Sequence, residues 1–191
     1  MHIQQEELIL KAKNNKNAFD KIMNIYSPYI YRLCRRLCKN KFDADDLFQN
    51  TWMKIYKNIN NYDISNKFEN WIYTICLNTY RDSYSKKKKL LSKVKDLFAS
   101  TEEKDLEINK VCDLSQSTDN EVISKMDSDK IHSYVNELKD IYRIPIILFY
   151  FKDLSYGDIS EITNVPIGTV KSRLSSAKTK LRKIMEDDYE K

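Results

Sequence analysis

Apolar residues recur every three to four positions through the first part of the chain, which is the spacing of amphipathic helices. Within residues 17–39, Ser27 precedes Pro28; serine is a favoured N-cap, and proline suits the first helical position. The pattern therefore predicts two helices in this range, divided at the Ser-Pro dipeptide. The second helix has one apolar stripe, made by Ile30, Leu33, Cys34, Leu37 and Cys38.

A further helix is predicted to begin at Asp43, which has cap chemistry, and to continue to about Lys57. Its apolar face comprises Ala44, Leu47, Phe48, Thr51 and Ile55. Its opposite face comprises Asp45, Asp46, Gln49, Met53 and Tyr56. Helix physics leaves two interpretations of this second face open. The carboxylates could simply stabilise the helix dipole in solvent, or the face could dock a basic partner.

A helix over residues 68–87 is predicted after the polar loop NINNYDISNK. Its buried stripe consists of Phe68, Trp71, Ile72, Ile75 and Thr79. It is flanked by a polar stripe of Asn70, Thr74, Asn78 and Arg81 and an aromatic stripe of Tyr73, Leu77, Tyr80 and Tyr84. Exposed aromatics stack on unpaired bases, and the lysines at 86–89 could neutralise phosphates, so the helix suits single-stranded nucleic acid. The alternative is that the tyrosines pack on a neighbouring helix and the lysines are solvated.

The last part of the chain has the layout of a helix-turn-helix. Residues 132–142 begin a helix on Val135, Leu138 and Ile141. Ser155 with Asp158 has the spacing of a capping box, and the break NVPIG separates that helix from the next. A helix, a short turn and a second helix form the motif whose second helix enters the major groove.

The second helix of this pair, from residue 166 onward, carries different chemistry on its two faces. The apolar face comprises Val170, Leu174, Ala177 and Leu181. The hydroxyl-bearing face comprises Thr169, Ser172, Ser175, Ser176 and Thr179, bordered by Lys171, Arg173 and Lys178. Small hydroxyls allow close approach to DNA, and cations reach phosphates or guanine. An ordinary amphipathic surface helix is the alternative.

Composition and charge extend this picture to the whole chain. Only two glycines and three prolines occur in 191 residues, which predicts an all-α fold. Net charge is +8 over residues 1–90, −4 over 91–130 and +1 over 131–191. These ranges predict two small helical domains joined by a flexible acidic linker, with a basic first domain that suits nucleic acid.

Other features restrict the classes of function. No apolar run approaches the roughly 20 residues of a membrane span, and the amino terminus lacks a signal-peptide pattern, so a cytoplasmic protein is expected. The four cysteines and two histidines show no metal-ligand spacing. Cys34 and Cys38 are expected to be buried thiols, with a redox or metal role as the alternative. We expect no cofactor and no small-molecule substrate.

Three stretches together resemble the small sigma factors of bacterial RNA polymerase known as the extracytoplasmic-function (ECF) group. They are FDADDLFQNTWMKIYKNINNYD, KFENWIYTICLNTYRDSYSKKKK and DLSYGDISEITNVPIGTVKSRLSSAKTKLRKI, and the resemblance covers roughly residues 18 to 185. It implies a protein that directs core RNA polymerase to specific promoters and nucleates DNA melting, in a stress or envelope response. It also implies control by an anti-sigma protein.

The resemblance assigns roles to the surfaces found above. The implied core polymerase-binding residues are Asp45, Asp46, Gln49 and Met53. The loop 60–67 and the following helix are implied to bind the minus-10 element and its melted non-template strand, through Tyr73, Thr74, Asn78, Arg81, Lys86 and Lys87. The duplex minus-35 element is implied to contact Thr169, Lys171, Ser172, Arg173 and Ser176. Two features depart from the family pattern: Ser175 and Ser176 stand where many relatives have larger or basic residues that face the promoter, and Asn50 stands on the docking helix where Glu is common.

Two other classes of function are alternatives to a sigma factor. A free-standing helix-turn-helix regulator would use only the last module and would leave the acidic face at Asp45 and Asp46 without a purpose. An enzyme acting on nucleic acid would need a metal–carboxylate cluster or a nucleophile. Asp43, Asp45 and Asp46 are the densest carboxylates, and they point in different helical directions, so we do not expect an enzyme.

Overall fold

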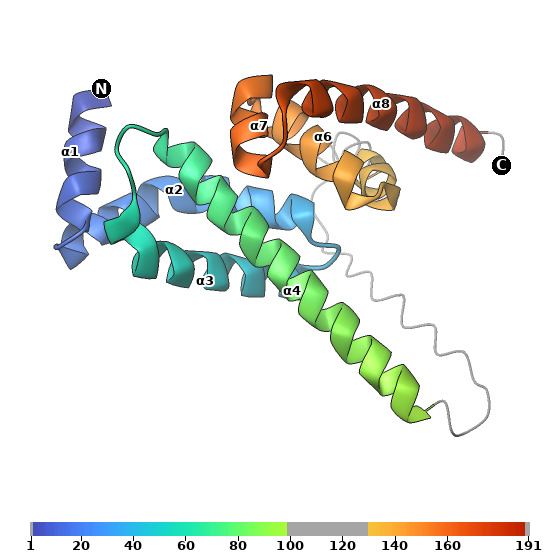
Figure 1. The fold of residues 1–191 in the computed structure, drawn as a ribbon, viewed down its shortest axis with the longest axis horizontal. Coiled ribbons are helices and arrows are strands. Elements are labelled where there is room, and N and C mark those ends of the chain that lie inside the picture. Colours follow the sequence, from blue (N-terminus) through green and yellow to red (C-terminus); the bar gives the residue numbers. More distant parts are fainter. Residues whose placement is uncertain (1, 99–129, 190–191) are drawn as a thin grey trace, which may run out of the picture. The chain divides into compact units, whose positions relative to one another are not determined.

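The structure is a computed structural model that describes residues 2–98 and 130–189, with the side chains of residues 6–87, 89, 90, 92 and 130–188. In these ranges every regular element is helical and no β-strand occurs, which confirms the all-α prediction. The chain divides into two compact units (Figure 1). The predicted linker 91–130 lies mostly outside the described residues, and its domain boundaries stay a prediction.

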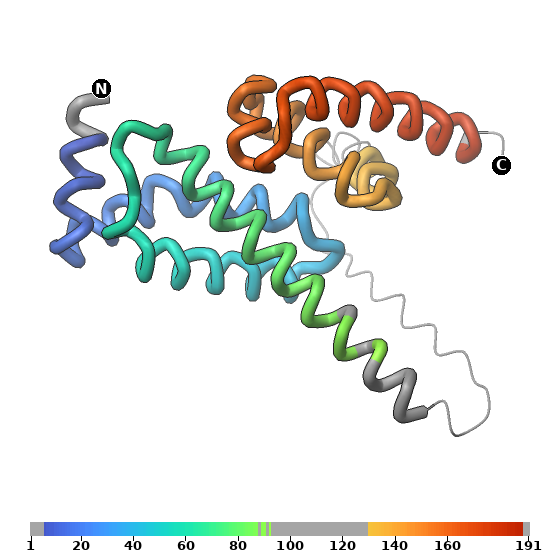
Figure 2. Tube along the Cα trace, in the orientation of Figure 1, coloured from blue at the N-terminus to red at the C-terminus, as the bar shows by residue number. Residues whose placement is uncertain are grey.

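The first unit is built from α1 (His2–Ala12), most of α2 (Lys16–Leu37), α3 (Lys41–Asn58), the 3-10 turn η1 (Ile59–Asn61) and α4 (Phe68–Phe98). In the trace of Figure 2, α4 crosses α2 and α3. Fully buried aliphatic side chains from all three helices form its core; these include Ile22, Ile30, Leu33, Ile55, Ile72 and Leu77. Burial of each such side chain contributes roughly 1.5–3 kcal/mol, so this packing fixes how α3 and α4 lie against each other.

The expected division of α2 at Pro28 is wrong, because Lys16–Leu37 is one helix with the proline inside it. A proline in a helix costs about 3 kcal/mol through a lost hydrogen bond and a clash. Here the buried side chains of Tyr26 and Ile30 lie on either side of it. Packing on both sides of the proline therefore outweighs its local preference for a helix start.

The N-terminus of α3 also differs from the prediction. The cap is Asn40, whose side-chain oxygen accepts a 2.8 Å hydrogen bond from the backbone N–H of Asp43. Asp43 instead lies in the first turn, where a carboxylate is favoured by the helix dipole. Asn40, nearly one turn before Asp43, therefore caps the helix in place of the predicted residue.

The second unit contains a helix at residues 130–137, α6 (Asp140–Lys152), α7 (Tyr156–Thr163) and α8 (Ile167–Tyr189). The predicted helix 132–142 is wrong at its end. The observed helix ends at residue 137, and Ile141 lies in α6, where its side chain is exposed. Val135 and Leu138 are buried as expected. The Ser155–Asp158 capping box is confirmed at the start of α7.

The pair α7 and α8 forms the predicted helix, turn and helix. Asn164 ends α7 in a left-handed conformation (φ 54°), and the Ser160 hydroxyl donates a 2.6 Å hydrogen bond to the carbonyl of Val165. Val170, Leu174 and Ala177 are buried, while Leu181 is half-buried. The apolar face of α8 therefore anchors it in its unit, and α8 packs on both α6 and α7.

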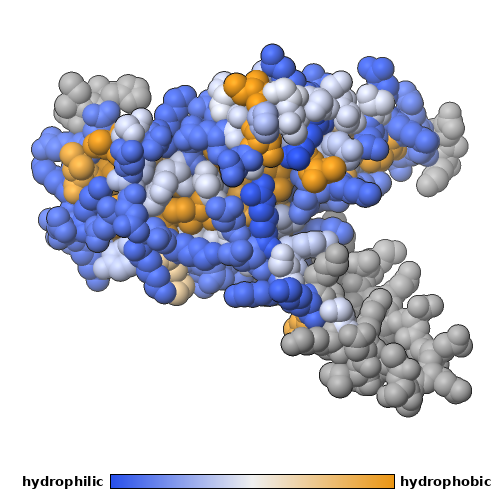
Figure 3. All heavy atoms as spheres, in the orientation of Figure 1, coloured by the Kyte–Doolittle hydropathy of each residue, from blue (hydrophilic) through white to orange (hydrophobic). Residues whose placement is uncertain are grey.

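Among the described helices, none is both long and apolar enough to cross a bilayer. On the face seen in Figure 3, hydrophilic side chains dominate the described surface, and hydrophobic ones gather in smaller patches.

Candidate functional site

The predicted docking face of α3 is largely exposed. Asp46 and Gln49 are exposed, and Met53 is 55% exposed. Asp45 differs, because it is half-buried and its carboxylate accepts a 2.9 Å hydrogen bond from the hydroxyl of Tyr31 on α2. This bond orients Asp45 within its own unit, so Asp46 is the carboxylate on this face that points most fully to solvent.

Two ion pairs join α3 to α4. Lys54 lies 2.8 Å from the carboxylate of Asp82, and Lys87 contacts the carboxylate of Asp43. All four side chains are more than a third exposed, so each pair contributes at most about 1 kcal/mol. Lys87, predicted to bind DNA, is therefore partly neutralised by Asp43 in this structure.

The predicted aromatic stripe of α4 is not an exposed surface. Tyr73 is only 5% exposed, and Leu77 and Tyr80 are buried as well. The expectation that Tyr73 offers a ring to an unpaired base is wrong, because α4 packs on more than one helix and its buried face is wider than a single stripe. Asn70 is buried for the same reason, whereas Tyr84 is exposed.

Burial of Tyr73 also predicts a pH effect on stability. Burial, with a smaller contribution from the Glu69 carboxylate, raises the pKa of Tyr73 from 10.0 to about 12. The unfolded chain therefore loses this proton first, and the free energy of unfolding should fall as pH rises from about 10 to about 12, by up to about 1.4 kcal/mol per pH unit. Denaturant unfolding at pH 8 and pH 11 should show a smaller fall for Tyr73→Phe than for the wild type. An equal fall in both proteins would contradict this assignment.

The remaining predicted residues of α4 lie at or near its surface. Asn78 and Arg81 are exposed, and a guanidinium N–H of Arg81 donates to the side-chain oxygen of Asn78 over 3.4 Å. Thr74 is half-buried, and its hydroxyl donates to the backbone carbonyl one turn earlier. Lys86 is exposed near the other end. Asn78 and Arg81 thus form the polar pair of this helix that is open to a ligand.

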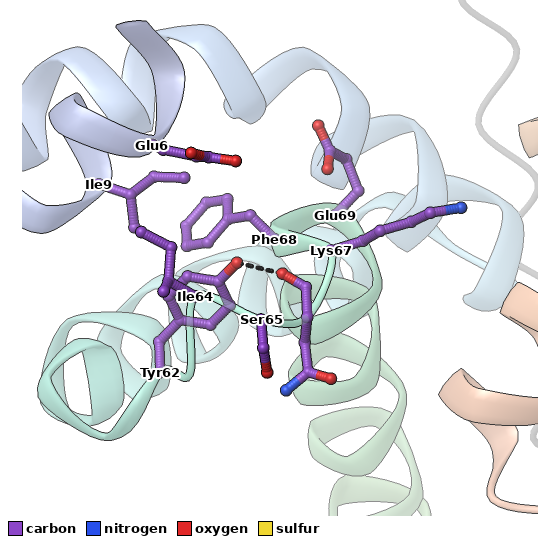
Figure 4. Close-up of a pocket in the computed structure, with 9 residues that line it drawn as sticks. Glu6, Ile9, Tyr62, Ile64, Ser65, Lys67, Phe68 and Glu69 are labelled. Atoms are coloured by element: carbon purple, nitrogen blue, oxygen red, sulfur yellow. Dashed lines mark hydrogen bonds between the residues drawn. The ribbon is translucent and has the colours of Figure 1, made fainter. Parts of the chain in front are cut away.

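A cavity of about 190 Å³ lies between α1 and the loop before α4 (Figure 4). Glu6 and Ile9 of α1 line one side, and Tyr62 and residues 64–69 line the rest. The hydroxyl of Tyr62 donates a 2.5 Å hydrogen bond to the carbonyl of Asn66, which closes the loop on itself. Lys13 also donates to the carbonyl of Tyr62 over 2.9 Å. The second bond ties the loop to the residue that follows α1.

The hydroxyl-bearing face of α8 lies at the surface of the second unit. Lys171, Ser172 and Ser176 are exposed, and Thr169 and Arg173 are half-buried. The Ser172 hydroxyl donates a 3.0 Å hydrogen bond to the carbonyl of Thr169, so its donor is satisfied within the helix. This face can be approached closely, because its exposed members are short apart from the cations at its borders.

Sequence reasoning missed several parts of these sites. It did not predict that α1 would form one wall of the cavity, and it did not assign Trp52 to the core, where that side chain is buried. Periodicity could have found Trp52, which follows Thr51 on the buried side of α3. Cys34 and Cys38 are buried thiols as expected, whereas Cys112 lies outside the described residues.

Comparison with known proteins agrees with this arrangement. Residues 22–90 match Sigma-70 region 2, and residues 128–181 match Sigma-70, region 4. The ECF RNA polymerase sigma factor SigW of Bacillus subtilis (strain 168) is 35% identical over 175 residues, which cover 92% of each chain. SigM of the same strain is 33% identical over 165 residues, or 86% of this chain and 93% of SigM.

The chain belongs to the ECF sigma factors, which act with RNA polymerase in promoter recognition and transcription initiation. Solved structures share the fold. The structure of CnrH in complex with the cytosolic domain of CnrY has a TM-score of 0.69 at 17% identity and covers 96% of this chain and 97% of that one. The sigma factor RpoE from Bartonella quintana, in complex with the anti-sigma factor NepR, has a TM-score of 0.64 at 24% identity and covers 88% of this chain and 96% of that one.

Proposed function

We propose that α3 docks on core RNA polymerase through Asp46, Gln49 and Met53, with Asp45 held beside them by Tyr31. The observation that supports this most directly is that carboxylate, amide and thioether side chains are exposed together on one helix face. A free-standing regulator would have no use for such a face. The purified chain added to core enzyme should give run-off transcripts from specific genomic promoters, and no added transcript from any promoter would refute the proposal.

The minus-10 element is proposed to contact α4 and the loop before it. Asn78 and Arg81 would face the melted non-template strand, with Thr74, Lys86 and Lys87 beside them. The cavity of about 190 Å³ against α1 has room for one flat ring, and its lining combines the rings of Tyr62 and Phe68 with polar side chains. An extruded base bound there would offset the few kcal/mol needed to unstack and unpair it.

The exposed amide of Asn78 provides a test of this role. A side chain that hydrogen-bonds a base contributes about 1–3 kcal/mol, so Asn78→Ala should reduce promoter opening roughly 10-fold. The reduction should appear as weaker permanganate reactivity of unpaired thymines near the start site, relative to the wild type. Binding to core polymerase serves as the control and should not change. Wild-type opening by the variant would contradict the assignment.

The minus-35 element is proposed to contact α8 through Thr169, Lys171, Ser172, Arg173 and Ser176. The relatives solved with CnrY or NepR also suggest a regulator, and we propose that an anti-sigma protein controls this chain. A stress or envelope response would then release it in the cytoplasm. The chain itself would catalyse no reaction, because opening is driven by binding.

A further inference from the structure

A row of aromatic rings lies in the second unit, outside the residues assigned above. Phe149 and Tyr150 come near the end of α6, and Tyr156 is the first residue of α7. The ring of Phe149 meets that of Tyr150 edge-on at 4.9 Å and stacks on that of Tyr156 at 5.2 Å and 16°. Tyr150 is 49% exposed and Tyr156 is 36% exposed. The row therefore presents aromatic edges to solvent.

Two lysines of α8 accompany this row. The ammonium of Lys178 lies 5.8 Å from the centre of the Tyr150 ring, and that of Lys171 lies 5.8 Å from the centre of the Tyr156 ring. Seven residues span nearly two turns, so both lysines lie on one border of α8, about 10 Å apart along its axis. We call Phe149, Tyr150, Tyr156, Lys171 and Lys178 the aromatic–lysine strip.

The positive charge of this strip is available to an anion. Within the described residues, neither Lys171 nor Lys178 forms an ion pair with a carboxylate, whereas Lys87 contacts Asp43. Lysine is charged at physiological pH, and the neighbouring hydroxyl of Tyr150 raises the pKa of Lys178 further. Lys178 thus lies beside the Tyr150 ring with a positive charge that no carboxylate pairs within the described residues.

We propose that the aromatic–lysine strip binds the sugar–phosphate backbone of promoter DNA beside the minus-35 element. Lys178 contacts a phosphate beyond the one reached from Lys171, and Tyr150 positions Lys178. The inference rests on the proposed role of α8. In a helix-turn-helix the second helix lies in the groove and the first crosses the backbone, and Tyr156 is where that first helix begins. Such contacts fix position and affinity but read no sequence.

The salt dependence of binding tests this contact directly. Holoenzyme made from the full chain and core polymerase would be titrated with a duplex promoter fragment found by run-off transcription, between 50 and 200 mM salt. Loss of one phosphate contact reduces the slope of log K against log salt by about 0.9. We expect this for Lys178→Gln, with an unchanged ratio of promoter to random-sequence affinity. An unchanged slope would overturn the proposal. A variant that weakens only polymerase binding and keeps the wild-type slope would overturn it as well.

The same unit offers a matched control away from α8. Lys139 is exposed immediately before α6, and within the described residues it forms no ion pair. Lys139→Gln removes the same charge from outside the proposed DNA-facing helix and should leave the slope unchanged. An equal reduction for both variants would overturn the assignment, since it would reflect net charge alone.

The positioning role of Tyr150 is tested by a double-mutant cycle. Tyr150→Leu removes the ring over which Lys178 lies and leaves an apolar side chain, so it should weaken binding at 50 mM salt about 3-fold. In the Lys178→Gln background the same change should have no effect, because the residue that it positions is gone. Equal losses in both backgrounds would refute this role. If wild-type holoenzyme binds no promoter selectively, the proposed function is refuted. If it binds selectively but the variants keep the wild-type slope, only the proposal about the strip is refuted.

Discussion

We expect Asp46→Arg to abolish binding of the chain to core RNA polymerase. The carboxylate is exposed on α3, so the change should cost little folding free energy. At an interface, however, truncating one partner of a hydrogen-bonded charge pair costs about 2–5 kcal/mol, and a reversed charge adds repulsion from a basic partner. Co-purification with core enzyme and run-off transcription should both fall by at least about 100-fold. The proposed contacts of α8 with DNA should be unaffected.

A charge reversal elsewhere in the same unit controls for this experiment. Glu7 is an exposed carboxylate on α1 whose salt bridge to Lys11, at 2.7 Å, is formed by two highly exposed side chains. Glu7→Arg applies the same change in charge away from α3, and it should leave polymerase binding near the wild-type level. If Asp46→Arg still supports transcription, or if Glu7→Arg is equally harmful, docking through α3 is refuted.

Much of the fold was predictable because helical periodicity and cap chemistry act locally. The Ser155–Asp158 capping box and the buried face of Val170, Leu174 and Ala177 follow from spacing alone. Pro28 shows where this reasoning fails. Local preference predicted a helix start there, but apolar contacts made on both sides by distant helices keep α2 continuous. Such contacts are set by tertiary packing, which a single sequence does not display.

The functional sites were predictable to a similar extent: exposure set by local helix geometry was predicted, whereas burial set by packing was not. Asp46 and Ser172 were assigned to exposed faces by helical angle, and both are exposed. Tyr73 was placed on an aromatic stripe whose exposure helix geometry left open, and it is buried, because the number of helices that pack on α4 determines how wide its buried face is. The cavity could not be predicted, since Glu6 and Phe68 are far apart in sequence and meet only in the folded unit.

The second large effect is expected at Leu174, which anchors α8 in its unit. Its side chain is 3% exposed, and α8 packs on α6 and α7. Leu174→Asp removes a buried leucine, which alone costs about 2–5 kcal/mol, and adds the cost of burying a carboxylate. The total exceeds what a small helical unit can lose, so the second unit should unfold. Unfolding would appear in circular dichroism as a loss of helical signal that corresponds to the residues of α6, α7 and α8.

The neighbouring position separates folding from DNA contact. Ser175 is exposed, so Ser175→Asp introduces the same carboxylate one residue along without burying it, and helicity should be retained. Promoter-specific transcription should be lost in Leu174→Asp and reduced in Ser175→Asp, where the added charge repels phosphates. Because the two units are compact separately, Leu174→Asp should still bind core polymerase through α3. Loss of that binding would show instead that the first unit depends on the second for its stability.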